Sequence, residues 1–178
     1  MLIILCQGPE DLKILDLPTP EPSGDEYLIA IHASATNFFD LLQIRGKYQH
    51  QPAFPWIAGS EFSGLILKAP SSLASGKTPK FKEGDKVFGA SQGGYATHIV
   101  CTEERLRPMP EGWSFLDAAG LFVTGPTSYA GLVTRAGIKK GRCSCVLSRR
   151  KRNADLIVQA IGSLSMQQLG ASVSQPCR

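Results

Sequence analysis

The chain has 178 residues, of which 43% are hydrophobic and 19% charged, and its formal net charge is +4. These values are typical of a globular protein with an apolar core. Four cations are consecutive, Arg149 to Arg152, and without them the net charge is zero, which argues against a protein-wide surface for nucleic acid.

The N-terminal segment predicts neither a signal peptide nor a membrane anchor. Its apolar run stops at Leu5, and no later window reaches the ~18 apolar residues that a transmembrane helix needs. The pair Cys143-x-Cys145 lacks the two-residue gap of common zinc knuckles. We therefore expect free thiols and a cytoplasmic, reducing location.

Short strands and turns are predicted for the first part of the chain. Met1 to Leu17 holds two apolar runs around a Gly-Pro turn, which suggests a hairpin. Tyr27 to Thr36 alternates apolar and polar residues, as a strand does. The segment "NFFDLLQIRG" predicts a short helix with Asn37 as N-cap and Gly46 at its end.

Three further strands are predicted before residue 110. One runs from Phe62 to Lys68, in a segment where Gly59 and Gly64 flank Glu61 and where we expect tight backbone turns. A second follows a turn at Gly84, within "FKEGDKVFGA". The third is predicted within "GGYATHIVCT". Most of the glycines are interpreted as corners of a β-barrel.

The pattern becomes helical after Met109. Capping residues at Ser114 and Thr124 and a break at Gly137 predict helices at residues 114–121 and 124–136. Strands followed by helices predict a mainly β fold with an α/β C-terminal part. The expected domains are residues 1–125 and 126–178.

Six segments occur in one order: "NFFDLLQIRGKY", "PWIAGSEFSGLI", "FKEGDKVFG", "GGYATHIV", "MPEGWSFLDAAGL" and "PTSYAGLVTRAGIKKG". In this order they resemble the medium-chain dehydrogenase/reductase superfamily, and within it the zinc-free quinone oxidoreductase branch. The resemblance covers roughly Met1 to Gly141. It implies a GroES-like β-barrel followed by a Rossmann-type nucleotide-binding domain, of which this chain holds an incomplete segment.

The resemblance also bears on metal. Zinc-dependent members carry a cysteine near the position of Asn37 and a histidine where this chain has Ser60. Neither amide nor serine hydroxyl is a usual Zn²⁺ ligand, so we expect no metal site.

The resemblance implies NADPH as cofactor and a quinone or enone as substrate. It implies that Asn37, Thr127 and Tyr129 contact the cofactor, and that Asp40 and Tyr48 line the substrate cleft; no catalytic residue is assigned. Other interpretations stay open: helix capping alone for Asn37, buried rings with bonded hydroxyls for Tyr48 and Tyr129, and a surface or capping carboxylate for Asp40.

The segment after Gly141 departs from the family pattern. A strand-like run, "CSCVLS", leads into "RRKRNADL", and no glycine occurs between Gly141 and Gly162. A dinucleotide site needs glycines where backbone approaches the pyrophosphate. We therefore expect a divergent, truncated tail with impaired cofactor binding. The alternatives are a nuclear-localisation or nucleic-acid patch in the basic run.

A second functional hypothesis is a non-enzymatic GroES-like module, or truncated isoform, that acts by binding a partner. Apolar positions of the predicted helix 124–136, Tyr129, Leu132 and Val133, need a partner surface, which makes a homo-oligomer possible.

Overall fold

The computed structural model describes residues 2–3 and 8–137. Residue contacts divide the chain into two compact units, Met1–Phe122 and Val123–Arg178, and each is described by itself. The strand and helix predicted after Gly141 lie outside the described residues.

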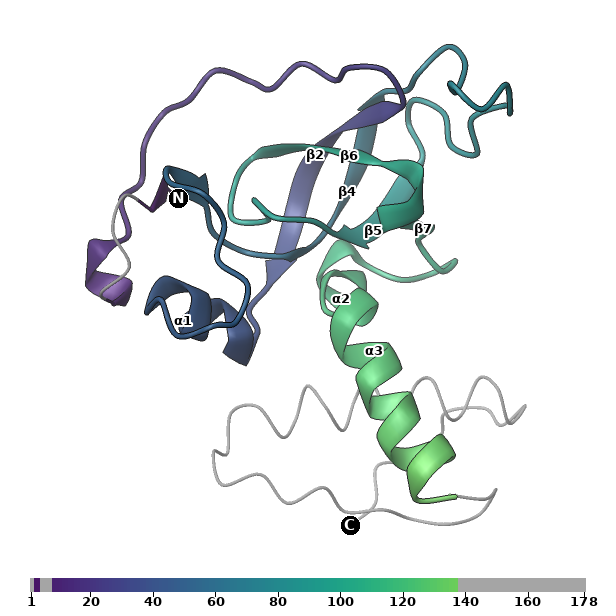
Figure 1. Cartoon of the computed structure of the whole chain (residues 1–178). Coiled ribbons are helices and arrows are strands. Elements are labelled where there is room, and N and C mark those ends of the chain that lie inside the picture. Colours follow the sequence, from purple (N-terminus) through teal and green to yellow (C-terminus); the bar gives the residue numbers. More distant parts are fainter. Residues whose placement is uncertain (1, 4–7, 138–178) are drawn as a thin grey trace. The chain divides into compact units, whose positions relative to one another are not determined.

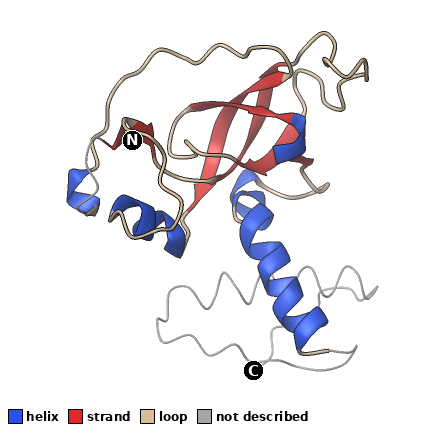
Figure 2. Ribbon diagram, in the orientation of Figure 1, coloured by secondary structure: helices blue, strands red, loops and turns tan. Residues whose placement is uncertain are grey.

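The first unit is built on a five-stranded antiparallel sheet (Figures 1 and 2). Its strands, in the order β6-β2-β4-β5-β7, are β6 (His98–Thr102), β2 (Glu26–Ala35), β4 (Glu61–Lys68), β5 (Lys86–Ala90) and β7 (Leu106–Pro108). Because β6 and β7 are its edges, the sheet forms half a barrel rather than a closed one. The expected mainly β, GroES-like architecture is confirmed in this form.

The core is formed by apolar residues that these strands contribute. It includes Tyr27 and Ile29 from β2, Phe62 and Ile66 from β4, and Val87 from β5. β4 is buried along most of its length, in keeping with its place in the middle of the sheet. Burial of such apolar side chains contributes about 1.5–3 kcal/mol each and is the main stabilising term.

Two of the glycines near Glu61 have different roles. Gly59 has a φ of +87°, a conformation that suits glycine, and the predicted turn is confirmed there. Gly64 is instead inside β4, opposite Ile31 of β2, so the turn predicted at Gly64 is wrong. A Cβ at Gly64 would collide with the backbone oxygen of Ala30, so this glycine permits two strands to approach closely.

A smaller layer joins the N-terminus to the segment before β4. β1 (Leu2–Ile3) pairs antiparallel with β3 (Trp56–Ile57). The predicted N-terminal hairpin includes residues 4–7, which lie outside the described residues. A 3₁₀ turn, η1 (Pro9–Asp11), follows β1. The helix α1 (Phe38–Ile44) is found where the sequence predicts it, and its last residue packs with Trp56 and Ala58.

The helical segment starts as predicted and then departs from the prediction. After the 3₁₀ turn η2 (Glu103–Arg105) and β7, Ser114 caps α2 (Phe115–Ala119), which packs against β2, β4 and β5. The predicted start at Thr124 is wrong, because α3 (Leu121–Tyr129) begins directly after Gly120 closes α2.

A π-helical segment, Ala130–Arg135, continues from α3 up to the turn at Gly137. Within the described ranges, 2–3 and 8–137, no helix has the length and apolar character needed to cross a bilayer.

Candidate functional site

Five polar side chains of the first unit form one hydrogen-bonded cluster. Asn37 and Asp40 come from the start of α1, Ser60 and Glu61 from the start of β4, and Tyr95 from the loop before β6. Segments from three parts of the chain meet here because β4 leads out of the turn at Gly59, next to the first turn of α1. We call these five residues the Asp40 cluster.

Asp40 is the centre of this cluster and is only 2% exposed. One carboxylate oxygen, Oδ2, accepts the backbone N–H of Asn37 (2.7 Å) and the hydroxyl of Tyr95 (3.0 Å). The other, Oδ1, accepts the hydroxyl of Ser60 at 3.1 Å. Burial raises the pKa of Asp40, and these three donors oppose that rise because they stabilise the ionised carboxylate.

Asn37 connects Asp40 to a second buried carboxylate. Its side-chain Nδ2 donates to Oε2 of Glu61 at 2.8 Å, and Glu61 is fully buried in β4. Asn37 is the N-cap of α1, as predicted, but its side chain makes no capping hydrogen bond. Capping alone therefore does not explain the position of its amide.

Tyr95 reaches Asp40 because its backbone is docked on the turn at Gly59. The Tyr95 N–H donates to the Ala58 carbonyl at 2.8 Å, and the tyrosine ring lies against Gly59. Burial, followed by the charge of Asp40, raises the pKa of Tyr95, so its hydroxyl stays protonated and donates.

The remaining predicted residue of this unit, Tyr48, lies apart from these hydrogen bonds. Its half-buried ring packs on Phe39 of α1, with 5.5 Å between ring centroids. In the part of the chain that the structure describes, its hydroxyl has no hydrogen-bond partner. The role of Tyr48, in the substrate wall or as a packed ring, stays a prediction.

Thr127 and Tyr129 belong to the second unit, where both are on α3. The Thr127 hydroxyl donates to the Val123 carbonyl at 2.8 Å, one turn earlier in the same helix. Tyr129 is 42% exposed, so it is not the buried ring that one interpretation expected.

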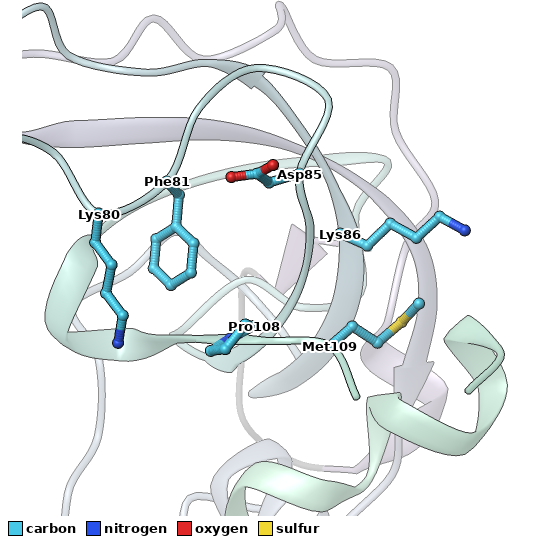
Figure 3. A pocket seen from close by; sticks show the side chains of 6 residues that line it. All are labelled: Lys80, Phe81, Asp85, Lys86, Pro108 and Met109. Carbon is cyan, nitrogen blue, oxygen red and sulfur yellow. The ribbon is translucent and has the colours of Figure 1, made fainter. Parts of the chain in front are cut away.

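The first unit also has an open depression of about 370 Å³, lined by Lys80, Phe81, Asp85, Lys86, Pro108 and Met109 (Figure 3). Its charged groups have local partners: the Asp85 carboxylate accepts the Lys82 N–H at 2.9 Å, and the Lys80 ammonium lies 5.4 Å from the Phe81 ring. None of the predicted site residues lines it, so the Asp40 cluster is the better candidate.

The sequence indicated Asn37 and Asp40 but not the groups that hold them. Glu61 was noticed only for its flanking glycines, and Tyr95 was not singled out at all. A signal for Glu61 was present, because a carboxylate at the start of an apolar strand is unusual unless it has a partner.

Three comparisons relate the chain to known proteins. A family model described as the alcohol dehydrogenase GroES-like domain matches residues 23–111. Among curated proteins, the chain is 34% identical over 116 residues to a quinone oxidoreductase-like protein 2 homolog from Nematostella vectensis, covering 64% of this chain and 30% of that protein. It is 33% identical over 137 residues to human quinone oxidoreductase, covering 75% of this chain and 40% of that protein.

A solved structure supports the same relationship. Escherichia coli quinone oxidoreductase, determined as a complex with NADPH, matches with a TM-score of 0.63 and 28% identity, covering 74% of this chain and 39% of that one. The chain thus spans about 30–40% of the length of these relatives. This chain belongs to the quinone oxidoreductase-like branch of the medium-chain dehydrogenase/reductase superfamily, and its first unit holds that family's GroES-like domain.

Proposed function

We propose that this chain provides the substrate-side domain of a zinc-independent oxidoreductase that passes hydride from NADPH to a quinone or an activated enone. The observation that carries the proposal is the half-buried Asn37 amide, anchored on a buried carboxylate within a domain of this family. NADPH would supply the hydride and leave as NADP⁺, and the reduced substrate would take one proton from solvent.

The residues have distinct roles in this proposal. Asn37, Thr127 and Tyr129 contact the nicotinamide end of the cofactor, and Tyr48 forms part of the substrate wall. Asp40 is too buried to touch a substrate directly. We therefore assign Asp40 to the support of the substrate cleft rather than to its surface.

The donor set supports chemistry without zinc. Ser60 stands at one position, and Asn37 near the other, for which the family resemblance implies metal ligands in zinc-dependent members. Here both donate hydrogen bonds to carboxylates, Ser60 to Asp40 and Asn37 to Glu61. A serine hydroxyl and an amide nitrogen are poor Zn²⁺ ligands, so the two positions fit a hydrogen-bonded support better than a metal site.

The part of the proposal that concerns the pyrophosphate rests on the sequence. Residues 142–161 contain no glycine, so this segment lacks the backbone that a Rossmann site places against phosphate. We infer that the chain binds NADPH weakly and mainly through the nicotinamide end. The cytoplasmic location and self-association stay predictions.

A comparison of two ligands tests this function. The full chain is titrated with NADPH and with reduced nicotinamide mononucleotide, which lacks the pyrophosphate and adenosine parts, and nicotinamide fluorescence is followed. Both are expected to bind with dissociation constants that differ by less than about tenfold, because the adenosine half contributes little here. Much tighter binding of NADPH would show that the cofactor site is intact.

Two further results decide between the hypotheses. Consumption of NADPH with a fully substituted benzoquinone, followed at 340 nm, is expected to be slow and to be unchanged by a zinc chelator. A chain that binds neither nicotinamide ligand contradicts the enzyme proposal and favours the non-enzymatic, partner-binding module. Loss of activity with the chelator contradicts the zinc-independent chemistry.

A further inference from the structure

The side chain and the backbone of Asn37 are held by two different buried carboxylates. The backbone N–H donates to Asp40 at 2.7 Å, from within the same helix turn. The side-chain Nδ2 donates to Glu61 at 2.8 Å, and Glu61 is 24 residues away in the chain. Both acceptors are almost fully buried, while Asn37 is partly exposed.

This arrangement decides which way the Asn37 amide points. The amide nitrogen Nδ2 of Asn37 donates to Glu61 Oε2, so the NH₂ end of the amide, and not its oxygen, faces Glu61. The flipped amide would bring two acceptor oxygens together at a buried site, which is strongly unfavourable. The chemistry of Glu61 therefore fixes the amide orientation.

The other side of Asn37 is fixed by the first turn of α1. Asn37 and Asp40 form a capping box: the Asn37 backbone N–H donates to Asp40, and the Asn37 side chain faces the backbone N–H of Asp40 without a hydrogen bond to it. That N–H donates instead to the backbone carbonyl of Asn37 at 3.2 Å. The amide oxygen is turned toward the helix and one N–H is given to Glu61. The second side-chain N–H of Asn37 has no hydrogen-bond partner among the described residues and is left to meet a ligand.

Asp40 itself is held rigidly. Ser60 and Tyr95 donate to its two oxygens from different segments, at 3.1 and 3.0 Å. A carboxylate with three donors from three parts of the chain cannot rotate without breaking at least one of these bonds. The backbone of Asn37 is therefore as firmly placed as its side-chain amide.

We propose that Glu61 is a positioning residue that holds the Asn37 amide with one N–H free, so that Asn37 recognises a carbonyl oxygen of the ligand. This inference rests on the proposed function. Two ligands supply such an oxygen, the carboxamide of nicotinamide and the ring carbonyl of a quinone. The orientation of Asn37 is present before either ligand binds.

The first experiment observes the side-chain amide of Asn37 in the full chain by ¹⁵N–¹H NMR, with no ligand present. One amide proton is expected far downfield and protected from exchange, through its bond to Glu61, and the other at an ordinary position. Addition of reduced nicotinamide mononucleotide or of a fully substituted benzoquinone, whichever binds, should shift the second proton. Two amide protons that both lie at ordinary positions and both exchange freely with solvent would overturn the positioning role.

The second experiment is a double-mutant cycle with Asn37→Ala, Glu61→Gln and the two combined. Binding of reduced nicotinamide mononucleotide and of a fully substituted benzoquinone is measured separately. Each single change is expected to weaken binding of the recognised ligand about threefold to tenfold, which is the value of one hydrogen bond. The double variant should be no weaker than Asn37→Ala, because Glu61 acts only through Asn37.

The controls separate positioning from folding and from function. Glu83→Gln removes an exposed carboxylate outside the cluster and should leave binding unchanged. Losses that add in the double variant would show that Glu61 acts independently of Asn37 and would overturn the proposal. If Glu61→Gln does not fold, the NMR result on the unmodified chain still decides the matter.

The two proposals also fail in different ways. Binding of neither ligand, with the downfield Asn37 proton present, contradicts the carbonyl recognition and the enzyme function while the amide orientation stands. Binding of a ligand without any shift of the second Asn37 proton contradicts this inference and leaves the enzyme function intact.

Discussion

Gly59 places Tyr95 beside Asp40 through backbone bonds. Its carbonyl accepts the N–H groups of Gly93 and Gly94, both at 2.9 Å, so the loop before β6 is docked on the turn before β4. A Cβ at Gly59 would lie 2.6 Å from the backbone nitrogen of Tyr95. Glycine is required there both by its positive φ and by this close approach.

Alanine substitutions at two glycines separate these two requirements. Gly59 and Gly84 both have a φ of +87°, but a Cβ at Gly84 meets nothing within 4 Å. Gly84→Ala should lower the free energy of unfolding by about 1–2 kcal/mol, the cost of a left-handed backbone. Gly59→Ala should cost about 1–3 kcal/mol more, because the methyl group displaces Tyr95. Urea unfolding measures both, and equal losses would contradict the steric argument.

The buried hydroxyl of Tyr27 should make the free energy of unfolding fall at alkaline pH. Its hydroxyl donates to Glu103 at 2.9 Å, and burial, assisted by Glu103, raises the pKa of Tyr27 to about 12. An unfolded tyrosine titrates near pH ~10, so the folded state holds this proton more tightly. The stabilisation is complete below pH ~10 and is lost as the pH rises toward about 12.

Tyr27→Phe measures this contribution. The free energy of unfolding of the variant should fall less steeply between pH ~10 and about 12 than that of the unmodified chain. Taking the difference between the two chains removes the titration of Tyr95 and Cys101, whose pKa values are also raised. The exposed Tyr129, changed to Phe, is the control. Identical pH profiles for Tyr27→Phe and the unmodified chain would refute the assignment.

At the level of elements, α2 is a short helix whose start is defined by its capping residues. Ser114 Oγ accepts the Asp117 N–H at 3.2 Å, and the Asp117 carboxylate accepts the Ser114 N–H at 3.2 Å and its hydroxyl at 2.6 Å. The two bonds that Ser114 donates to the carboxylate, from its hydroxyl and then its N–H, lower the pKa of Asp117. Because α2 packs on three strands, the capping of its start also helps to hold this helix against the sheet.

Loss of this cap should destabilise the first unit. Ser114→Ala is expected to lower the free energy of unfolding by about 1 kcal/mol at neutral pH. The difference should shrink as the pH falls below ~4, because protonated Asp117 no longer supports the box. Ser72→Ala, at an exposed position in a loop, should change stability by less than about 0.5 kcal/mol. Thermal unfolding of both variants at neutral and acidic pH tests this, and a pH-independent loss contradicts the role of Asp117.

The same elements show which parts of the fold a sequence can predict. α1 and the start of α2 were predicted because capping residues and apolar spacing are local signals. The pairing of Leu2 with Ile57 is not local, and two residues of strand carry no periodicity, so this pairing was not predicted. Glu61 and Tyr95 were missed as site residues for the same reason: their roles arise only when distant segments meet.

Over the whole molecule, the core that supports the site belongs to the first unit. Its buried apolar cluster draws on β2, β4, β5, β6 and β7, all within Met1–Phe122. Phe122, the last residue of that unit, lies 6.3 Å from the ring of Phe88 and 5.4 Å from the guanidinium carbon of Arg107. These contacts indicate where the unit can be cut without loss of its core.

We therefore expect a fragment of residues 1–122 to fold by itself. It should unfold cooperatively in urea, and its amide NMR signals for β2, β4 and β5 should match those of the full chain, because their core partners are all present. A fragment of residues 1–120 is the matched control: it lacks Phe122 and should be less stable by about 1 kcal/mol, the value of its aromatic and cationic contacts. A fragment 1–122 with collapsed, poorly dispersed signals would show that the sheet needs residues beyond Phe122. If both fragments fold equally well, the role given to Phe122 is wrong while the independence of the unit holds.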